Sequence, residues 1–160
     1  MGRLLPLILA LAAVSCSGQA APLDQTIRVD EVVTGWFGAE PTEDGKNKIV
    51  PSISLKLTNT GTEPIGAVQL NLIFKRVGDP EEWSTALVPA VKRQTGLAPG
   101  ATSEAIVIRA PQGYTGVQSR TQLLENRLFV DAKVEIFGKH GSAPPVKIGE
   151  YRIDRQLLAE

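Results

Sequence analysis

The chain has 160 residues, 42% of them hydrophobic, which is enough for one domain with its own apolar core. Its 17 basic and 17 acidic residues cancel, so it lacks the concentrated positive charge that selects nucleic acid or an anionic membrane surface. The single cysteine, Cys16, excludes an intramolecular disulfide and any Cys-x-x-Cys metal or redox motif.

The first 20 residues have the layout of a secretion signal. A short basic start at Arg3 precedes an apolar run from Leu4 to Val14, and small residues follow. The run is well short of the roughly 20 apolar residues that a membrane-spanning helix needs. We therefore expect residues 1–20 to direct export.

The end of this signal allows two interpretations. Ala13-Val14-Ser15-Cys16 resembles the lipobox of bacterial lipoproteins, in which the cysteine is lipidated and becomes the mature N-terminus. The resemblance implies a lipid on Cys16 as the only membrane contact and, because Ser17 follows, an outer-membrane lipoprotein on the periplasmic side. Cleavage after Ala20 is the alternative, and it would release a secreted or soluble periplasmic protein. In both cases we expect a tether over residues 21–26 and a single domain over residues 27–160.

From residue 27 onward, strand-forming and turn-forming segments alternate. Residues 27–37 are rich in β-branched and aromatic side chains, and we expect a bulge at Glu31, where the alternation breaks. Residues 52–58 and 68–74 alternate apolar and polar side chains with a period of two, which is typical of half-buried strands. The Asn, Gly and Pro residues of the segment between them predict a turn.

The second half of the chain continues this pattern. Residues 83–91 predict a fourth strand, in which Pro89 favours an edge position. Residues 103–110 predict a fifth strand whose middle is apolar on both faces and therefore covered on both sides. Residues 118–127 predict one or two helical turns or an irregular connection. Two further strands are predicted at 128–137, where the alternation is clearest, and at 146–157.

Seven strands separated by turns, without helix-period segments between them, indicate an all-β antiparallel sandwich or barrel. The strand that ends in Asn59-Thr60-Gly61, the following Pro64-Ile65 and the turn Leu97-Ala98-Pro99-Gly100 resemble bacterial extracytoplasmic immunoglobulin-like domains, including the FxLYD type. This resemblance implies an immunoglobulin-like antiparallel β-sandwich of about seven strands, with room for one short helical turn. It also implies an envelope domain that binds or presents other molecules without catalysis.

Candidate catalytic and metal-binding residues are few. His140 is the only histidine and lies in a predicted surface turn, whereas a catalytic triad needs a base held between a nucleophile and a carboxylate. The oxygen-bearing side chains of segment 40–47 lack the spacing of an EF-hand loop. The adjacent acids Glu81 and Glu82 would point to opposite faces of a strand. We therefore predict a non-catalytic protein with no cofactor and no metal site.

Two pairs of aromatic residues are candidate binding residues. Phe129 and Phe137 share one parity of the strand 128–137, and we expect that face and the exposed strand edges to recruit a protein partner in the envelope. Trp36 and Trp83 favour instead a carbohydrate- or small-ligand-binding module, although most of the eight aromatic residues must fill the core. A hydrolase is the least supported alternative. The predicted function is an exported, lipid-anchored interaction or accessory module.

Overall fold

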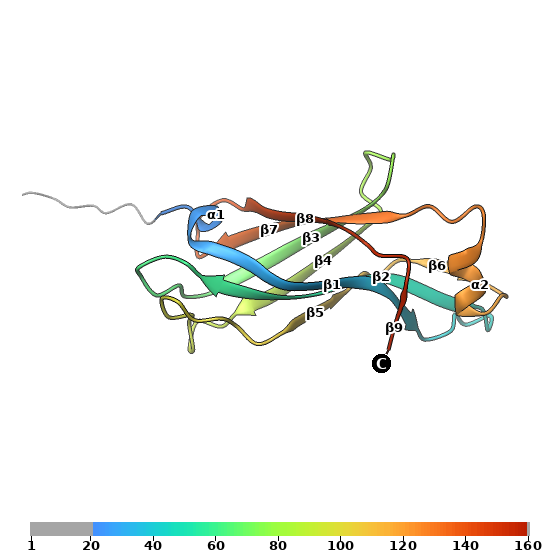
Figure 1. Cartoon of the computed structure of the whole chain (residues 1–160), viewed down its shortest axis with the longest axis horizontal. Coiled ribbons are helices and arrows are strands. Elements are labelled where there is room, and N and C mark those ends of the chain that lie inside the picture. Colours follow the sequence, from blue (N-terminus) through green and yellow to red (C-terminus); the bar gives the residue numbers. More distant parts are fainter. Residues whose placement is uncertain (1–20, 160) are drawn as a thin grey trace, which may run out of the picture.

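The computed structural model describes residues 21–159, and these form an all-β sandwich of two packed sheets (Figure 1). This arrangement confirms the predicted fold class. Over the described range the chain contains nine strands and two short helices. The predicted secretion signal and its Cys16 lie outside the described residues.

The first sheet has the strand order β5-β2-β1-β9. Its centre is the antiparallel pair β1 (Ile27–Ala39) and β2 (Asn47–Asn59). The strands β5 (Ile106–Arg109) and β6 (Tyr114–Gly116) pair with different parts of β2, and β9 (Leu157–Leu158) pairs in parallel with β1. The expected bulge in β1 is confirmed, because the register shifts between Asp30 and Val33 and Glu31 has a φ of 49°.

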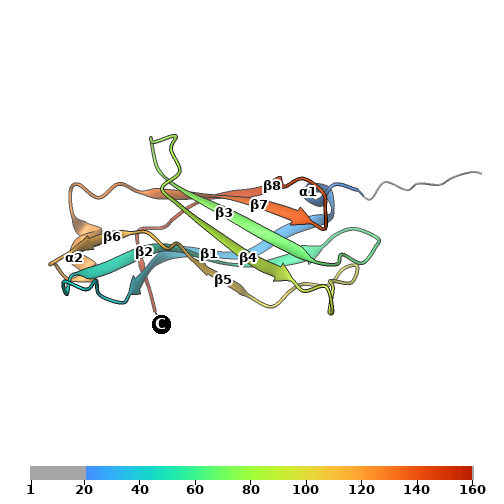
Figure 2. The same cartoon turned by 180° about the vertical axis from the view of Figure 1, so that it is seen from behind.

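The second sheet is antiparallel throughout and has the order β4-β3-β7-β8 (Figure 2). It consists of β3 (Val68–Arg76), β4 (Ser84–Val91), β7 (Ala132–His140) and β8 (Val146–Arg152). The strand β4 lies at its edge, as Pro89 predicts. The seven strands of four or more residues thus divide into three and four. The chain changes sheet after β2, β4, β6 and β8, which is an immunoglobulin-like arrangement.

The core between the sheets is built from alternate positions of the long strands. In β3, the inward side chains of Val68, Leu70, Leu72 and Phe74 are buried, and the three residues between them, two polar and one isoleucine, point outward. The same alternation buries Ile53, Leu55 and Leu57 in β2 and Ala132, Val134 and Ile136 in β7. Each large aliphatic side chain buried in this way stabilises the fold by about 1.5–3 kcal/mol. The predicted period-two pattern is confirmed in these three strands.

Asn59 organises the turn after β2. Its side chain is completely buried, and its Nδ2 donates hydrogen bonds to the carbonyl oxygens of Glu63 (2.9 Å) and Leu97 (2.8 Å). Its Oδ1 accepts a hydrogen bond from the amide of Gly61 (2.9 Å). One side chain therefore ties this turn to the loop that precedes β5, which explains why the two turn motifs occur together in the sequence.

Two expectations about strands are wrong. The fifth strand is not covered on both sides, because β5 lies at the edge of its sheet and Val107 is 59% exposed. The expected last strand, 146–157, is divided in two. β8 ends at Arg152, and the chain then crosses to the other sheet, where the carbonyl oxygen of Gln156 accepts a hydrogen bond from the amide of Trp36 (2.8 Å).

Of the expectations about connecting segments, one needs correction and one is confirmed. The tether expected over residues 21–26 does not hold for Leu23–Thr26, which form the one-turn helix α1 and bury Leu23 against Gly138 of β7. In the region 118–127 the expected helical turn is present as α2 (Arg120–Glu125), with a capping box at its start and both of its leucines buried. The strand β6 just before it is not predicted, since three residues carry no periodicity.

The sandwich is elongated, and the two helices lie at its opposite ends (Figure 1). α1 lies at the end where the described chain begins, whereas α2 and β6 lie at the other end. We call these the α1 end and the α2 end.

Candidate functional site

Four of the eight aromatic residues gather between the sheets at the α2 end. Trp36 comes from β1 and Tyr114 from β6. Trp83 directly precedes β4, and Phe129 lies three residues before the start of β7. The ring of Trp36 lies 4.8 Å from that of Phe129 and 5.6 Å from that of Tyr114, measured between centroids. Tyr114 in turn lies 5.0 Å from Trp83. Aromatic pairs at such distances contribute about 0.5–1.5 kcal/mol each beyond their burial, so this cluster closes the core at the α2 end.

Two members of the cluster also reach the protein surface. Trp36 and Phe129 are buried, whereas Trp83 and Tyr114 are half-buried. The hydroxyl of Tyr114 donates a hydrogen bond to the carbonyl oxygen of Val130 (3.1 Å). Burial raises the pKa of Tyr114 above its ordinary value, so the hydroxyl keeps its proton at neutral pH. Tyr114 therefore connects the core cluster to the exposed chain that leads into β7.

Exposed aliphatic side chains lie beside Tyr114, whose ring contacts that of Trp83. Leu128 is 86% exposed and lines a hollow together with Tyr114, while the exposed Val77 and Val130 line an adjacent hollow. We call Val77, Trp83, Tyr114, Leu128 and Val130 the α2-end surface. A group of exposed apolar side chains of this kind is characteristic of a contact site for another molecule.

Three of the charged groups beside the α2-end surface are paired with one another. Asp131 accepts hydrogen bonds from Arg152 and Arg155, and these bonds hold the pKa of Asp131 below its usual range. The guanidinium of Arg155 also lies 4.8 Å from the ring centroid of Phe129. Since these charges satisfy one another, the apolar side chains remain the dominant feature of the surface.

The structure separates the binding residues that the sequence predicts. Phe129 belongs to the buried cluster, whereas Phe137 is half-buried on the outer face of β7, so the expected common face of these two residues is wrong. The reason is that β7 begins only at Ala132, and the chain before it does not continue the alternation. Trp36 lies in the core, and of the two tryptophans only Trp83 is partly accessible.

Three residues of the α2-end surface are not singled out by the sequence. Val77 lies between the predicted strands 68–74 and 83–91. Leu128 and Val130 fall within the predicted strand 128–137, on the parity opposite to Phe129 and Phe137. Isolated apolar residues of this kind carry no functional signal, because many surface residues are apolar. Only their proximity in the fold marks them as a group.

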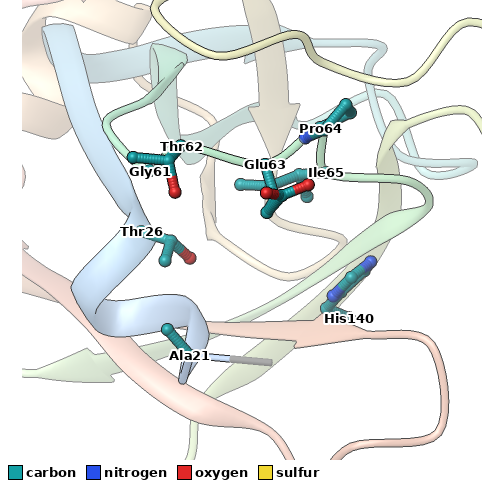
Figure 3. A pocket seen from close by; sticks show the side chains of 8 residues that line it. All are labelled: Ala21, Thr26, Gly61, Thr62, Glu63, Pro64, Ile65 and His140. Atoms are coloured by element: carbon teal, nitrogen blue, oxygen red, sulfur yellow. The ribbon is translucent and has the colours of Figure 1, made fainter. Parts of the chain in front are cut away.

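The only histidine lies at the α1 end. His140 and Glu63 line a small pocket there, and Figure 3 shows both side chains among the residues around it. The pocket has a volume of about 130 Å³, whereas ligand pockets typically measure about 300–1,000 Å³. Within residues 21–159, no three His, Cys, Asp or Glu side chains gather in a way that could hold a metal ion. The pocket is therefore a weaker candidate than the α2-end surface.

The exposed edges of β4 and β1 are also weaker candidates. Pro89 lacks the N–H that a strand added beside β4 would need, and its ring disfavours such pairing. β1 pairs with β9 only at Trp36 and Phe37, and the rest of that edge carries the bulge at Glu31. Bulges and prolines at sheet edges prevent the addition of further strands. The α2-end surface thus remains the best candidate site.

No protein-family model and no curated protein sequence matches this chain. Among solved structures, it is similar to a Bordetella pertussis protein described as ApaA, with 14% identity, a TM-score of 0.41, and coverage of 79% of this chain and 91% of that one. It is also similar to an X-ray structure described as Northeast Structural Genomics Consortium target SoR45, with 15% identity, a TM-score of 0.41, and coverage of 82% and 89%. Both TM-scores are low, so neither structure informs the function of this chain. No helix within residues 21–159 is long and apolar enough to cross a membrane.

Proposed function

We propose that this protein is a non-catalytic, exported interaction module that binds another protein through the α2-end surface. The observation that carries the proposal is the group of exposed aliphatic side chains around Trp83 and Tyr114. Tryptophan and tyrosine are enriched at the centres of protein interfaces, because each combines a large apolar ring with one polar atom. The surrounding aliphatic side chains would exclude water from these rings in a complex.

The position of this surface suits the predicted lipid anchor on the periplasmic side of the outer membrane. The described chain begins at the α1 end (Figure 1), and Cys16 precedes it in the sequence. A lipid on Cys16 would hold the α1 end near the membrane, so the α2-end surface would face a partner in the periplasm. Without the lipid, the same surface would serve a secreted or soluble periplasmic protein.

Site-specific crosslinking in cells tests this function. We would place a photoreactive residue at Val77 in the full chain and compare otherwise unchanged protein with Leu128→Asp and Val130→Asp variants. Both changes put a charge on an exposed side chain, so the fold should persist while the apolar contact is lost. We expect a discrete protein adduct that each aspartate reduces about tenfold, since one desolvated charge opposes binding by at least about 1.4 kcal/mol.

Leu87→Asp is the matched control. Leu87 is 61% exposed and lies on β4, on the outer face of the second sheet, so this change should leave the adduct intact. Absence of an adduct, or an adduct unaffected by both α2-end changes, would contradict the proposal. A carbohydrate-binding module is the alternative, supported by the partly accessible Trp83. It would be favoured if glycans, and no protein, changed the tryptophan fluorescence.

A further inference from the structure

The outer face of the first sheet carries a second apolar region, separate from the α2-end surface. Pairing between the strands places Val33 and Val107 on either side of Ser54 in one row across the sheet. The next row contains Gly35, Ser52 and Arg109. Apart from Gly35, these residues line a groove of about 380 Å³ together with Phe37 and Leu158, and we call it the outer groove.

The outer groove exposes aliphatic carbon above a floor of small residues. Val33 is 50% exposed and Val107 59%, and they flank the small side chain of Ser54. Leu158 packs so closely over Gly35 that a methyl group added there would lie 2.7 Å from the leucine side chain. The C-terminal strand β9 thus forms one wall of the groove.

Arg109 is a cation that is held in place without an anionic partner among residues 21–159. Its guanidinium lies 3.4 Å from the ring centroid of Phe37, so stacking restricts the side chain at one corner of the outer groove. Among the ion pairs formed within residues 21–159, none includes Arg109. Its N–H groups therefore remain available to a carboxylate from outside.

An exposed acid lies outside the groove on the same face of the sheet, diagonally across from Arg109. Glu31 sits in the bulge of β1, where its side chain is 65% exposed and pairs with Lys56 (2.7 Å). Ser52, Ser54 and Lys56 follow one another on the outer face of β2. Ser52 is the pairing partner of Arg109, whereas Lys56 forms the ion pair with Glu31. Arg109 and Glu31 therefore lie on opposite sides of Ser54, on the two strands that flank β2.

We propose that the outer groove binds a second copy of this chain in a two-fold symmetric dimer. In such a contact the same surface of each copy meets the other, so the surface must complement itself. A two-fold axis in the plane of the interface, near Ser54, sets Arg109 of each copy opposite Glu31 of the other. Val33 and Val107 then pack at the centre. This charge complementarity selects a second copy, because one face of the first sheet carries both Arg109, which has no ion pair within residues 21–159, and the exposed acid Glu31. The dimer is independent of the proposed partner-binding function.

Charge reversal tests the dimer. The protein is expressed as the full chain and measured in its processed form. Sedimentation equilibrium would compare the unchanged protein with Arg109→Glu, Glu31→Arg and the double variant. Each single change should weaken dimerisation about a hundredfold, because two symmetric ion pairs are reversed and each contributes about tenfold. The double variant should recover most of this loss, since its charges are complementary again. Arg93→Glu, an exposed charge reversal outside the groove, is the control and should leave dimerisation unchanged.

Chemical trapping provides a second, independent test. Packed sheets lie about 10 Å apart, beyond the reach of a direct disulfide, so Ser54→Cys would be treated with a short bis-maleimide. We expect crosslinked dimer for Ser54→Cys, and none for Thr85→Cys on the outer face of the second sheet or for the unchanged chain, whose only cysteine is Cys16. The proposal is overturned if the unchanged protein is monomeric up to about 1 mM. It is also overturned if the double charge reversal is no better than the single ones, or if both cysteine variants crosslink equally.

Discussion

Replacing Gly113 with alanine tests the closest backbone contact at the α2 end. The added methyl carbon would lie 1.9 Å from the carbonyl oxygen of Ile49 and 2.9 Å from the Cα of Val50. An ordinary contact needs at least 3.4 Å, so β6 would have to move away from β2 by about 1.5 Å, the difference between these distances. Since the two strands pair only over Asn47–Ile49, such a shift should break one or two of their hydrogen bonds.

The expected loss of stability follows from these two effects. Overpacking typically costs about 1–3 kcal/mol, and each lost hydrogen bond adds about 1 kcal/mol. We therefore expect Gly113→Ala to lower the free energy of unfolding by about 2–5 kcal/mol. Urea unfolding followed by tryptophan fluorescence measures this directly, because Tyr114 carries the displacement to both tryptophan rings.

Gly45→Ala is the matched control for this experiment. Gly45 has a φ of +76° but open space around its Cα, so alanine there adds backbone strain of about 1 kcal/mol and no clash. If Gly113→Ala costs no more than Gly45→Ala, the close approach of β6 to β2 is refuted. The position of Tyr114 at the α2-end surface would then be refuted as well.

Three further changes test other parts of the fold. Trp36→Ala should lower the free energy of unfolding by about 3–5 kcal/mol in urea titrations, because it empties the centre of the aromatic cluster. Trp36→Phe should cost much less, since within the described chain the buried Nε1 of Trp36 has no hydrogen-bond partner to lose. Asn59→Ala should lower the free energy of unfolding by about 2–4 kcal/mol in the same assay, because three hydrogen bonds of a buried side chain are lost. Its control, Asn126→Ala on the exposed chain before Leu128, should lower it by less than about 1 kcal/mol. Acid should destabilise the protein between pH 4.5 and about 2, because hydrogen bonds from Lys147 and Lys133 lower the pKa of Glu150 to about 2. As the pH falls, the unfolded chain binds the proton of Glu150 before the folded chain does. The contribution of Glu150 to the free energy of unfolding is therefore constant above this range and is lost through it. Glu150→Gln should flatten the decline in circular dichroism titrations.

How much of the fold could be predicted depended on the length of each pattern. In β3, nine residues of regular alternation predict the strand and its buried face, because an error of one residue would expose every apolar side chain. The bulge at Glu31 and the edge position of β4 were also predictable, since each follows from one residue that breaks a local rule. β6 and β9 were not, because strands of two or three residues form only where a longer strand is already in place.

The candidate site was much less predictable than the fold. Phe129 and Phe137 are eight positions apart in one apparent strand, yet the strand begins between them and the two rings lie in different layers. Trp36 and Trp83 look equivalent in the sequence, but only Trp83 is partly accessible. Membership of a site depends on contacts between distant segments, and no local pattern encodes these contacts in a single sequence.

The sequence by itself determined that this protein is an all-β sandwich, which strands form its core, and where its main turns lie. Those features follow from the two-residue period of strands and the backbone preferences of Gly, Asn and Pro, both of which act locally. Only the tertiary structure decided that Val77, Trp83, Tyr114, Leu128 and Val130 form one surface, and that Arg109 and Glu31 lie diagonally across one face of the first sheet. Strand pairing and sheet packing bring these residues together across long sequence separations, so their proximity exists only in the folded chain.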